Sequence, residues 1–108
     1  MPPIRIRYSE RMEKAVDAFA VNSDFPSKAK SVEYIMLRYL NSPVVYSELE
    51  IFELREPSLR SLSIELSKEI SDLITGFANS HGITVSSAIR MAIYQELICH
   101  EESDVDPE

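Results

Sequence analysis

The chain of 108 residues contains one cysteine, two glycines, two histidines and no tryptophan. Cys99 has no second cysteine with which to form an internal disulfide. The sequence has no glycine-rich phosphate loop, no G-x-S-x-G nucleophile motif and no Cys/His spacing typical of a zinc site. We therefore predict no catalytic residues, no metal site and no cofactor, and we expect that the protein is not an enzyme.

Long hydrophobic runs are also missing. No apolar stretch approaches the roughly 20 residues that a membrane-spanning helix needs. The first ten residues, MPPIRIRYSE, lack the apolar segment of a signal peptide. These absences predict a cytoplasmic protein that does not contact membranes.

Acidic residues exceed basic ones, giving a net charge of −7, but they are unevenly distributed. Residues 1–41 hold seven Lys/Arg and five Asp/Glu, whereas the last eight residues, EESDVDPE, hold five acids and no base. Residues 42–57 contain four acids and one base. A phosphate responds to the local field rather than to the total charge, so nucleic-acid binding by the first half is compatible with this composition.

The dominant pattern in the sequence is an internal repeat. Ile4, Ile6 and Tyr8 alternate with polar residues, and an apolar pattern of helical period follows them. The same switch from period 2 to period 3.6 recurs 58 positions later, at Leu62, Ile64 and Leu66. The offset is clear for the strand and the first helix of each copy, and we assign the repeat to those elements only.

Each copy reads as strand, helix, turn and helix. Ser9, Ser67 and Thr84 are expected helix N-caps, and Gly82 suits the left-handed conformation that often ends a helix. Ser47-Glu48-Leu49-Glu50 is a capping-box pattern that allows a short helix over 47–55, with Leu49 and Phe52 on the core. The expected elements are strands over 4–8 and 59–66 and helices over 10–21, 28–40, 68–79 and 84–100.

The predicted fold class is a mostly helical α+β protein. Two strand-helix-helix units, over 1–41 and 58–100, flank an acidic connector over 42–57, and a disordered acidic tail follows over 101–108. Two copies of such a unit can bury their apolar faces against each other, so we expect both units of one chain to share a core of four helices. The competing arrangement is a homodimer that pairs like strands, in which Arg5 and Arg7 would repel their copies.

The second copy, SIELSKEISDLITGFANSHGITVSSAIRMAIYQEL, resembles the ribbon-helix-helix family of DNA-binding proteins, which includes Arc and the methionine repressor. The connector region LRYLNSPVVYSELEIFELREP is similar to a segment of the TraY proteins of conjugative plasmids, some of which carry two copies in one chain. The resemblance implies that the two strands pair antiparallel within the chain and that the resulting ribbon enters the major groove of double-stranded DNA. It also implies that the second helices bind the flanking phosphates through their N-termini.

The pleat assigns candidate base-reading side chains to the ribbon. Successive side chains point to opposite faces, so the set expected to face outward is Pro3, Arg5, Arg7, Ser61, Ser63 and Glu65. Arginine presents a planar fork that matches the O6 and N7 atoms of guanine. The alternative is that Arg5 and Arg7 are ordinary solvent-facing residues. Glu65 either reads a base or pairs with one of these arginines.

The beginnings of the second helices are candidate phosphate clamps, because a helix N-terminus presents unpaired amides and a partial positive charge. The residues assigned to this role are Lys28, Lys30, Ser31, Thr84, Val85 and Ser86. Simple helix capping, or a solvated face for the two lysines, is the alternative interpretation.

The function favoured by this resemblance is sequence-specific DNA binding at a plasmid transfer origin, as an accessory protein of the relaxosome. The relaxase and other relaxosome proteins are then candidate partners. We expect a monomeric pseudo-dimer, of which several copies can bind one DNA. The alternatives are a transcriptional repressor or antitoxin of the same fold, and an acidic interaction adaptor that has lost DNA binding.

Overall fold

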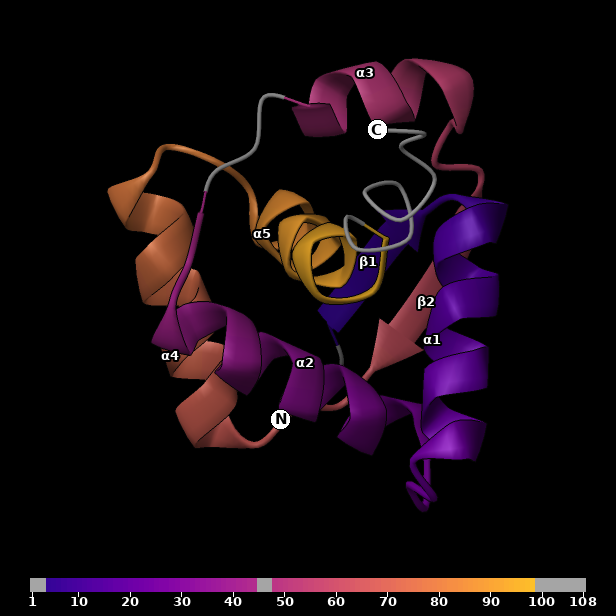
Figure 1. Ribbon diagram of the computed structural model, residues 1–108. Helices are drawn as coiled ribbons and strands as arrows, with labels where there is room; N and C mark the ends of the chain where they lie inside the picture. Colours follow the sequence, from indigo (N-terminus) through magenta and orange to yellow (C-terminus); the bar gives the residue numbers. More distant parts are fainter. Residues whose placement is uncertain (1–3, 45–47, 99–108) are drawn as a thin grey trace.

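The computed structural model describes residues 4–44 and 48–98, without the side chains of residues 48, 50 and 51. Pro3, Ser47, Cys99, His100 and the tail over 101–108 lie outside the described residues. The elements are β1 (Ile4–Tyr8), α1 (Glu10–Asn22), α2 (Lys28–Asn41), α3 (Glu48–Arg55), β2 (Arg60–Ile64), α4 (Lys68–Ser80), α5 (Val85–Ile93) and a final π-helical turn η1 (Tyr94–Ile98) (Figure 1). The predicted mostly helical α+β class is confirmed.

The two strands form an antiparallel ribbon within the chain, as predicted. Ile4 pairs with Ile64, Arg5 with Ser63 and Tyr8 with Arg60. The repeat offset of 58 positions also joins Arg5 to Ser63, so this pair lies on the pseudo-twofold axis that relates the two units. Each residue of the first strand therefore corresponds to the residue 58 positions later in the second unit.

The helices begin at the polar residues that the sequence indicated. The hydroxyl groups of Ser9 and Ser67 accept hydrogen bonds from the amides three residues later, and Thr84 does the same for Ser87. Gly82 has a φ of +65°, and Asp24 has a φ of +61° at the corresponding position of the first unit. Both units thus turn between their helices through a left-handed residue.

The repeat extends further than the sequence pattern indicated, which corrects our restriction of it to strand and first helix. The N-caps of the second helices, Ser27 and Thr84, are 57 positions apart, and so are their ends at Asn41 and Ile98. The single lost position lies between the left-handed turn residue and the N-cap. This deletion shifts the register of the second helix, which is why a constant offset did not reveal it.

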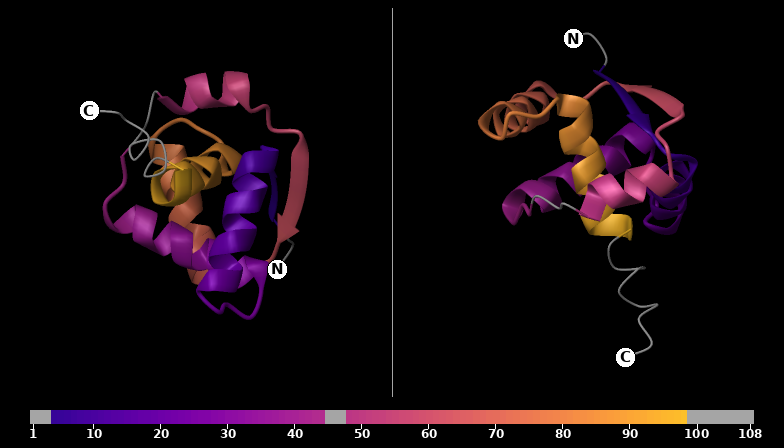
Figure 2. Two further views of the ribbon diagram at one scale, coloured as in Figure 1. Left: turned by 45° about the vertical axis from the view of Figure 1, so that its right-hand side comes forward. Right: turned by 90° about the horizontal axis from the view of Figure 1, so that it is seen from above.

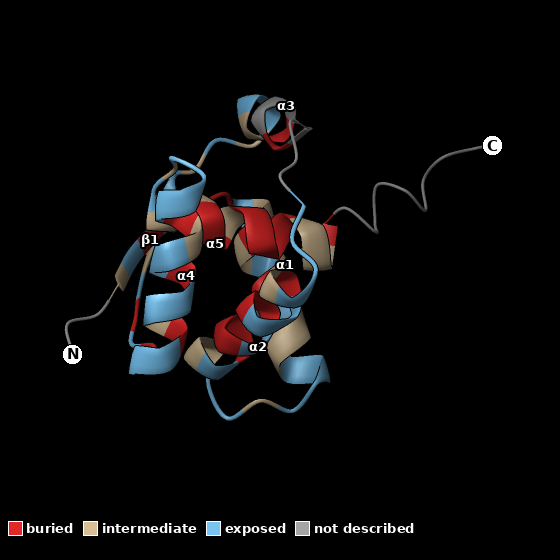
Figure 3. Ribbon diagram, turned by 90° about the vertical axis from the view of Figure 1, so that its left-hand side faces the viewer, coloured by how far each residue is buried: buried red, intermediate tan, exposed pale blue. Residues whose placement is uncertain are grey.

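The core lies where α1, α2, α4 and α5 face one another beneath the ribbon (Figure 2). Val16, Ile35, Ile74 and Ile89 are among its fully buried side chains. Figure 3 shows the buried stripes of these helices turned inward and the outer face of α4 exposed. One apolar stripe on each helix, repeated at a period of about 3.6 residues, accounts for this arrangement.

Two cross-unit hydrogen bonds are formed by residues at corresponding positions of the second helices. Glu33 of α2 accepts a 2.7 Å hydrogen bond from the amide of Ser67, at the start of the second unit's first helix. Its counterpart 57 positions later is Arg90 of α5, which donates to the carbonyl oxygen of Arg7 at 3.1 Å. Each second helix is therefore bonded to the strand-to-helix region of the other unit.

The connector contributes α3, so the predicted short helix is present. Leu49 and Phe52 are 5% and 1% exposed and belong to the main core. The Phe52 ring lies edge-on against Tyr94, with 5.4 Å between centroids. The connector is thus a structural part of the second unit's surface as well as the link between the units.

Candidate nucleic-acid interface

The outer face of the ribbon carries the polar side chains of both strands. Arg5, Arg7, Ser61, Ser63 and Glu65 are exposed. They alternate with the inward side chains, of which Ile6 and Tyr8 are fully buried. The register places Arg5 opposite Ser63 and Arg7 opposite Ser61, so the four side chains form one continuous polar surface.

Charge is distributed asymmetrically about the pseudo-twofold axis. The counterpart of Arg7 is Glu65, 58 positions later, so one end of the ribbon face is basic where the other is acidic. Within the described part of the chain, no ion pair joins Glu65 to Arg5 or Arg7, and neither arginine pairs with another acid. The expected alternative, in which Glu65 forms an ion pair with Arg5 or Arg7, is therefore not observed.

Arg60, at the start of β2, belongs to a different environment. Its guanidinium lies 3.6 Å from the carboxylates of both Glu10 and Glu13 on α1. The positive charge of Arg60 is therefore partly neutralised by two carboxylates of α1, whereas Arg5 and Arg7 have no such partner among the described residues.

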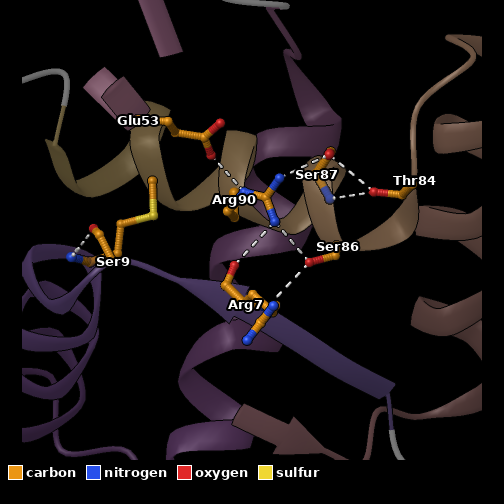
Figure 4. A network of polar contacts seen from close by, with 8 residues as sticks. Arg7, Ser9, Glu53, Thr84, Ser86, Ser87 and Arg90 are labelled. Atoms are coloured by element: carbon orange, nitrogen blue, oxygen red, sulfur yellow. Dashed lines mark hydrogen bonds and ion pairs between the residues drawn. The ribbon is translucent and has the colours of Figure 1, made fainter. Parts of the chain in front are cut away.

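The beginning of α5 lies against the free edge of β1 (Figure 4). The amide of Arg7 donates to the Ser86 hydroxyl group at 3.2 Å. Thr84 caps the helix by accepting from the Ser87 amide at 3.0 Å. The first turn of α5 is thus held beside Arg7, one of the two outward arginines. The first backbone N–H groups of this helix have no acceptor within the helix.

Arg90 connects this region to α3 (Figure 4). Its guanidinium donates to the Ser86 and Ser87 hydroxyl groups at 2.9 and 3.0 Å. It also forms a 2.6 Å ion pair with Glu53 of α3. The side chain is 16% exposed, so the surrounding structure largely removes this charge from solvent. Arg90 fixes the spacing between the β1 edge, the α5 N-terminus and α3.

The beginning of α2 differs from that of α5. Lys28 forms a 2.9 Å ion pair with Asp17, and Lys30 lies 3.4 Å from Glu33. Ser31 is fully buried, and its hydroxyl group donates to the carbonyl oxygen of Lys28 at 2.6 Å. The two lysines are therefore partly neutralised, and Ser31 does not reach the surface where a phosphate could bind.

Tyr8 places a polar atom inside the core. Its hydroxyl group is buried and has no hydrogen-bond partner of acceptable geometry among the described residues. Burial raises the pKa of Tyr8, although the nearby Lys28 ammonium opposes the shift. Burial would lower the pKa of Lys28, but its contacts with Asp17 and Tyr8 outweigh that effect and the pKa is raised.

Replacing Tyr8 by phenylalanine is expected to change the free energy of unfolding at pH 7 by less than about 1 kcal/mol, because it removes both the desolvation cost of the buried hydroxyl group and its favourable interaction with Lys28. The raised pKa of Tyr8 gives the wild type a stability component that is complete below pH 10 and decreases as pH rises through the folded-state pKa. Urea unfolding between pH 7 and pH 11 should show a shallower alkaline decline for Tyr8→Phe. An unchanged decline would contradict the buried, unbonded hydroxyl group.

Arg90 is the important residue that sequence reasoning missed. Its partner Arg7 is 83 positions away and Glu53 is 37 positions away, so no local motif connects them. The one local signal is the spacing to Ser86, four residues earlier on the same helix. That spacing is common on helices and does not indicate an interface by itself.

Comparisons of the chain with protein-family models, with curated proteins and with solved structures find no match. Within residues 4–44 and 48–98, no helix is both long enough and apolar enough to cross a membrane. The same residues contain no cluster of three or more His, Cys, Asp or Glu side chains that could hold a metal ion.

Proposed function

We propose that this chain binds double-stranded DNA in a sequence-specific manner, with the β1–β2 ribbon in the major groove. The observation that carries the proposal is the exposed pair Arg5 and Arg7 on a two-stranded antiparallel ribbon, with no acidic partner among the described residues. A two-stranded ribbon fits the roughly 12 Å width of the major groove. Arginines at this place can form bidentate hydrogen bonds to guanine.

The position of the α5 N-terminus supports the same interpretation on one side of the ribbon. The α5 N-terminus lies beside Arg7 and presents Thr84, Val85 and Ser86, with the partial positive charge of a nine-residue helix. At the α2 N-terminus, Lys28 and Lys30 already have carboxylate neighbours. We therefore expect one strong phosphate contact and one weak contact, rather than two equal ones.

The asymmetry of the ribbon defines the kind of site. Arg7 on one side of the axis and Glu65 on the other cannot read the two halves of a palindrome identically. We propose a non-palindromic site with guanine contacts beneath Arg5 and Arg7. Glu65 favours cytosine, whose N4 amino group donates a hydrogen bond.

Within this proposal, the cellular role is that of a cytoplasmic relaxosome accessory protein of the TraY type, with the relaxase as a candidate partner. A repressor or antitoxin with the same fold uses the same DNA chemistry and would bind upstream of genes instead of at a transfer origin. The acidic adaptor is the remaining alternative, favoured by the net charge of −7 and by Glu65.

The testing experiment is selection of a random duplex library with the full chain, followed by sequencing and titration of the selected duplex. We expect a non-palindromic motif containing guanine, bound with an affinity that falls linearly on a log–log plot against salt. Two to four phosphate contacts correspond to a slope of about −2 to −4. If no sequence is enriched even at low salt, the DNA-binding proposal is wrong and the adaptor alternative gains support.

A further inference from the structure

The second helices of the two units correspond position by position, with an offset of 57. Val32 and Ile89, and likewise Met36 and Ile93, are fully buried in both units. The burial differs along one face only. Leu37 is 47% exposed whereas its counterpart Tyr94 is 3% exposed, and Tyr34 is 42% exposed whereas Met91 is 5% exposed.

The helix α3 accounts for this difference. It lies on the side of α5 that faces away from α2 (Figures 1 and 2). Phe52 packs on Tyr94, and Glu53 pairs with Arg90 at 2.6 Å. Arg11 of α1 lies over the Phe52 ring, 5.7 Å from its centroid. The chain thus contains a short helix that contacts α1 through Arg11, α5 through Arg90 and η1 through Tyr94.

The pseudo-twofold axis generates a second face of the same kind between α2 and α4, two helices in direct contact. We call it the α2–α4 face and define it by Glu33, Leu37, Glu69 and Leu73, the counterparts of Arg90, Tyr94, Arg11 and Ala15. Leu73 is an apolar residue on α4 and is 54% exposed. Among the described residues, Leu37 and Leu73 stay about half exposed, whereas α3 buries Tyr94 on the corresponding face.

The charges of the two faces are opposite. Arg11 and Arg90 flank the acidic helix α3, and their counterparts on the α2–α4 face are the carboxylates Glu69 and Glu33. Glu33 already accepts from Ser67 and Lys30, whereas Glu69 forms no ion pair with the described residues. This reversal disfavours α3 of a second copy, because acid would lie beside acid, and favours a basic helix.

We propose that the α2–α4 face binds an amphipathic helix of a partner protein. The bound helix presents Leu or Phe to Leu37 and Leu73, and a Lys or Arg to Glu69. The partner helix lies on α2 as α3 lies on α5. Here the basic group is on the bound helix and the acidic group is on this chain. This surface lies on the helices and not on the ribbon, so the proposal does not depend on DNA binding.

The test uses two fluorescent peptides, each held helical by a side-chain staple. One has the chain's own sequence SELEIFELRE, and in the other every glutamate is lysine. We expect the lysine peptide to bind the full chain at least tenfold more tightly than the glutamate peptide. Glu69→Lys should weaken binding of the lysine peptide at least fivefold and strengthen binding of the glutamate peptide.

Matched controls distinguish this face from general attraction to an acidic protein. Leu37→Glu and Leu73→Glu should each weaken binding of the lysine peptide at least tenfold, whereas Leu54→Glu, at a site 83% exposed on α3, should change it less than twofold. A scrambled lysine peptide without an apolar face should not bind. The proposal is overturned if the scrambled peptide binds as tightly as the lysine peptide, or if Leu54→Glu weakens binding as much as Leu37→Glu does. It is also overturned if changes in amide NMR shifts of the wild type place the bound peptide away from Leu37 and Leu73.

Discussion

Substituting both Arg5 and Arg7 by alanine is expected to lower affinity for the selected DNA at least 100-fold and to leave the fold intact. Both side chains are exposed and lack acidic partners among the described residues, so their removal costs little stability. Each bidentate arginine–guanine contact contributes about 1–3 kcal/mol of base discrimination. Fluorescence anisotropy at one fixed salt concentration, with selected and scrambled duplexes, measures the effect. The loss should be far larger for the selected duplex.

The matched control for this prediction is Arg60→Ala. Arg60 is a 52% exposed arginine at the end of the same ribbon, but it is engaged by Glu10 and Glu13. Arg60→Ala removes one positive charge, as Arg5→Ala or Arg7→Ala alone does. It should change the affinity for the selected duplex less than threefold. Equal losses for Arg60→Ala and Arg7→Ala would mean that the ribbon attracts DNA through charge alone. A double variant that keeps its preference for the selected duplex would contradict base reading by Arg5 and Arg7.

Removing the Arg90 side chain is expected to have the largest effect on stability among the substitutions of charged residues considered. Arg90→Ala should lower the free energy of unfolding by about 2–4 kcal/mol, because it leaves Glu53 without its cation and the Arg7 carbonyl without its donor. For a domain of this size, the loss corresponds to a decrease in Tm of about 10–20 °C. Thermal and urea unfolding followed by circular dichroism measure it.

Two comparisons show whether the effect comes from the network. Arg38→Ala removes a 60% exposed arginine that lies 3.4 Å from Glu96 and should cost less than about 1 kcal/mol. Arg90→Lys keeps the charge but loses the planar fork that reaches Glu53, Ser86 and Ser87, so its stability should be intermediate. If Arg90→Ala melts at the wild-type temperature, the link between α3, β1 and α5 contributes nothing measurable.

Local signals in the sequence were sufficient for most of the helices and for the two strands, whereas the antiparallel pairing of the strands was expected from the family resemblance. Alternation at Ile4, Ile6 and Tyr8 and the caps Ser9 and Ser67 depend on neighbours within a few residues. The short helix α3 was expected from its capping-box pattern for the same reason. The second helices escaped the repeat analysis because one missing residue changed their offset, although they begin and end at corresponding positions.

The candidate interface was accessible to sequence reasoning only in part. The pleat alone requires Arg5 and Arg7 to share a face, and the structure adds that Ser63 and Ser61 lie opposite them. Composition could not show that Lys28 and Lys30 have acidic neighbours or that Ser31 is buried. Those facts depend on how α1 and α2 pack, and a count of charges contains no information about packing.

The sequence by itself determined that the chain is a repeated strand-helix-helix unit with two arginines on one face of its first strand. These features follow from backbone periodicity and helix capping, which act over a few residues. Tertiary structure decided which residues meet across the chain: Arg90 with Arg7, Glu33 with Ser67, and α3 with only one of two equivalent faces. Such contacts join residues tens of positions apart, and their partners are chosen by packing of the whole core, to which every helix contributes at once.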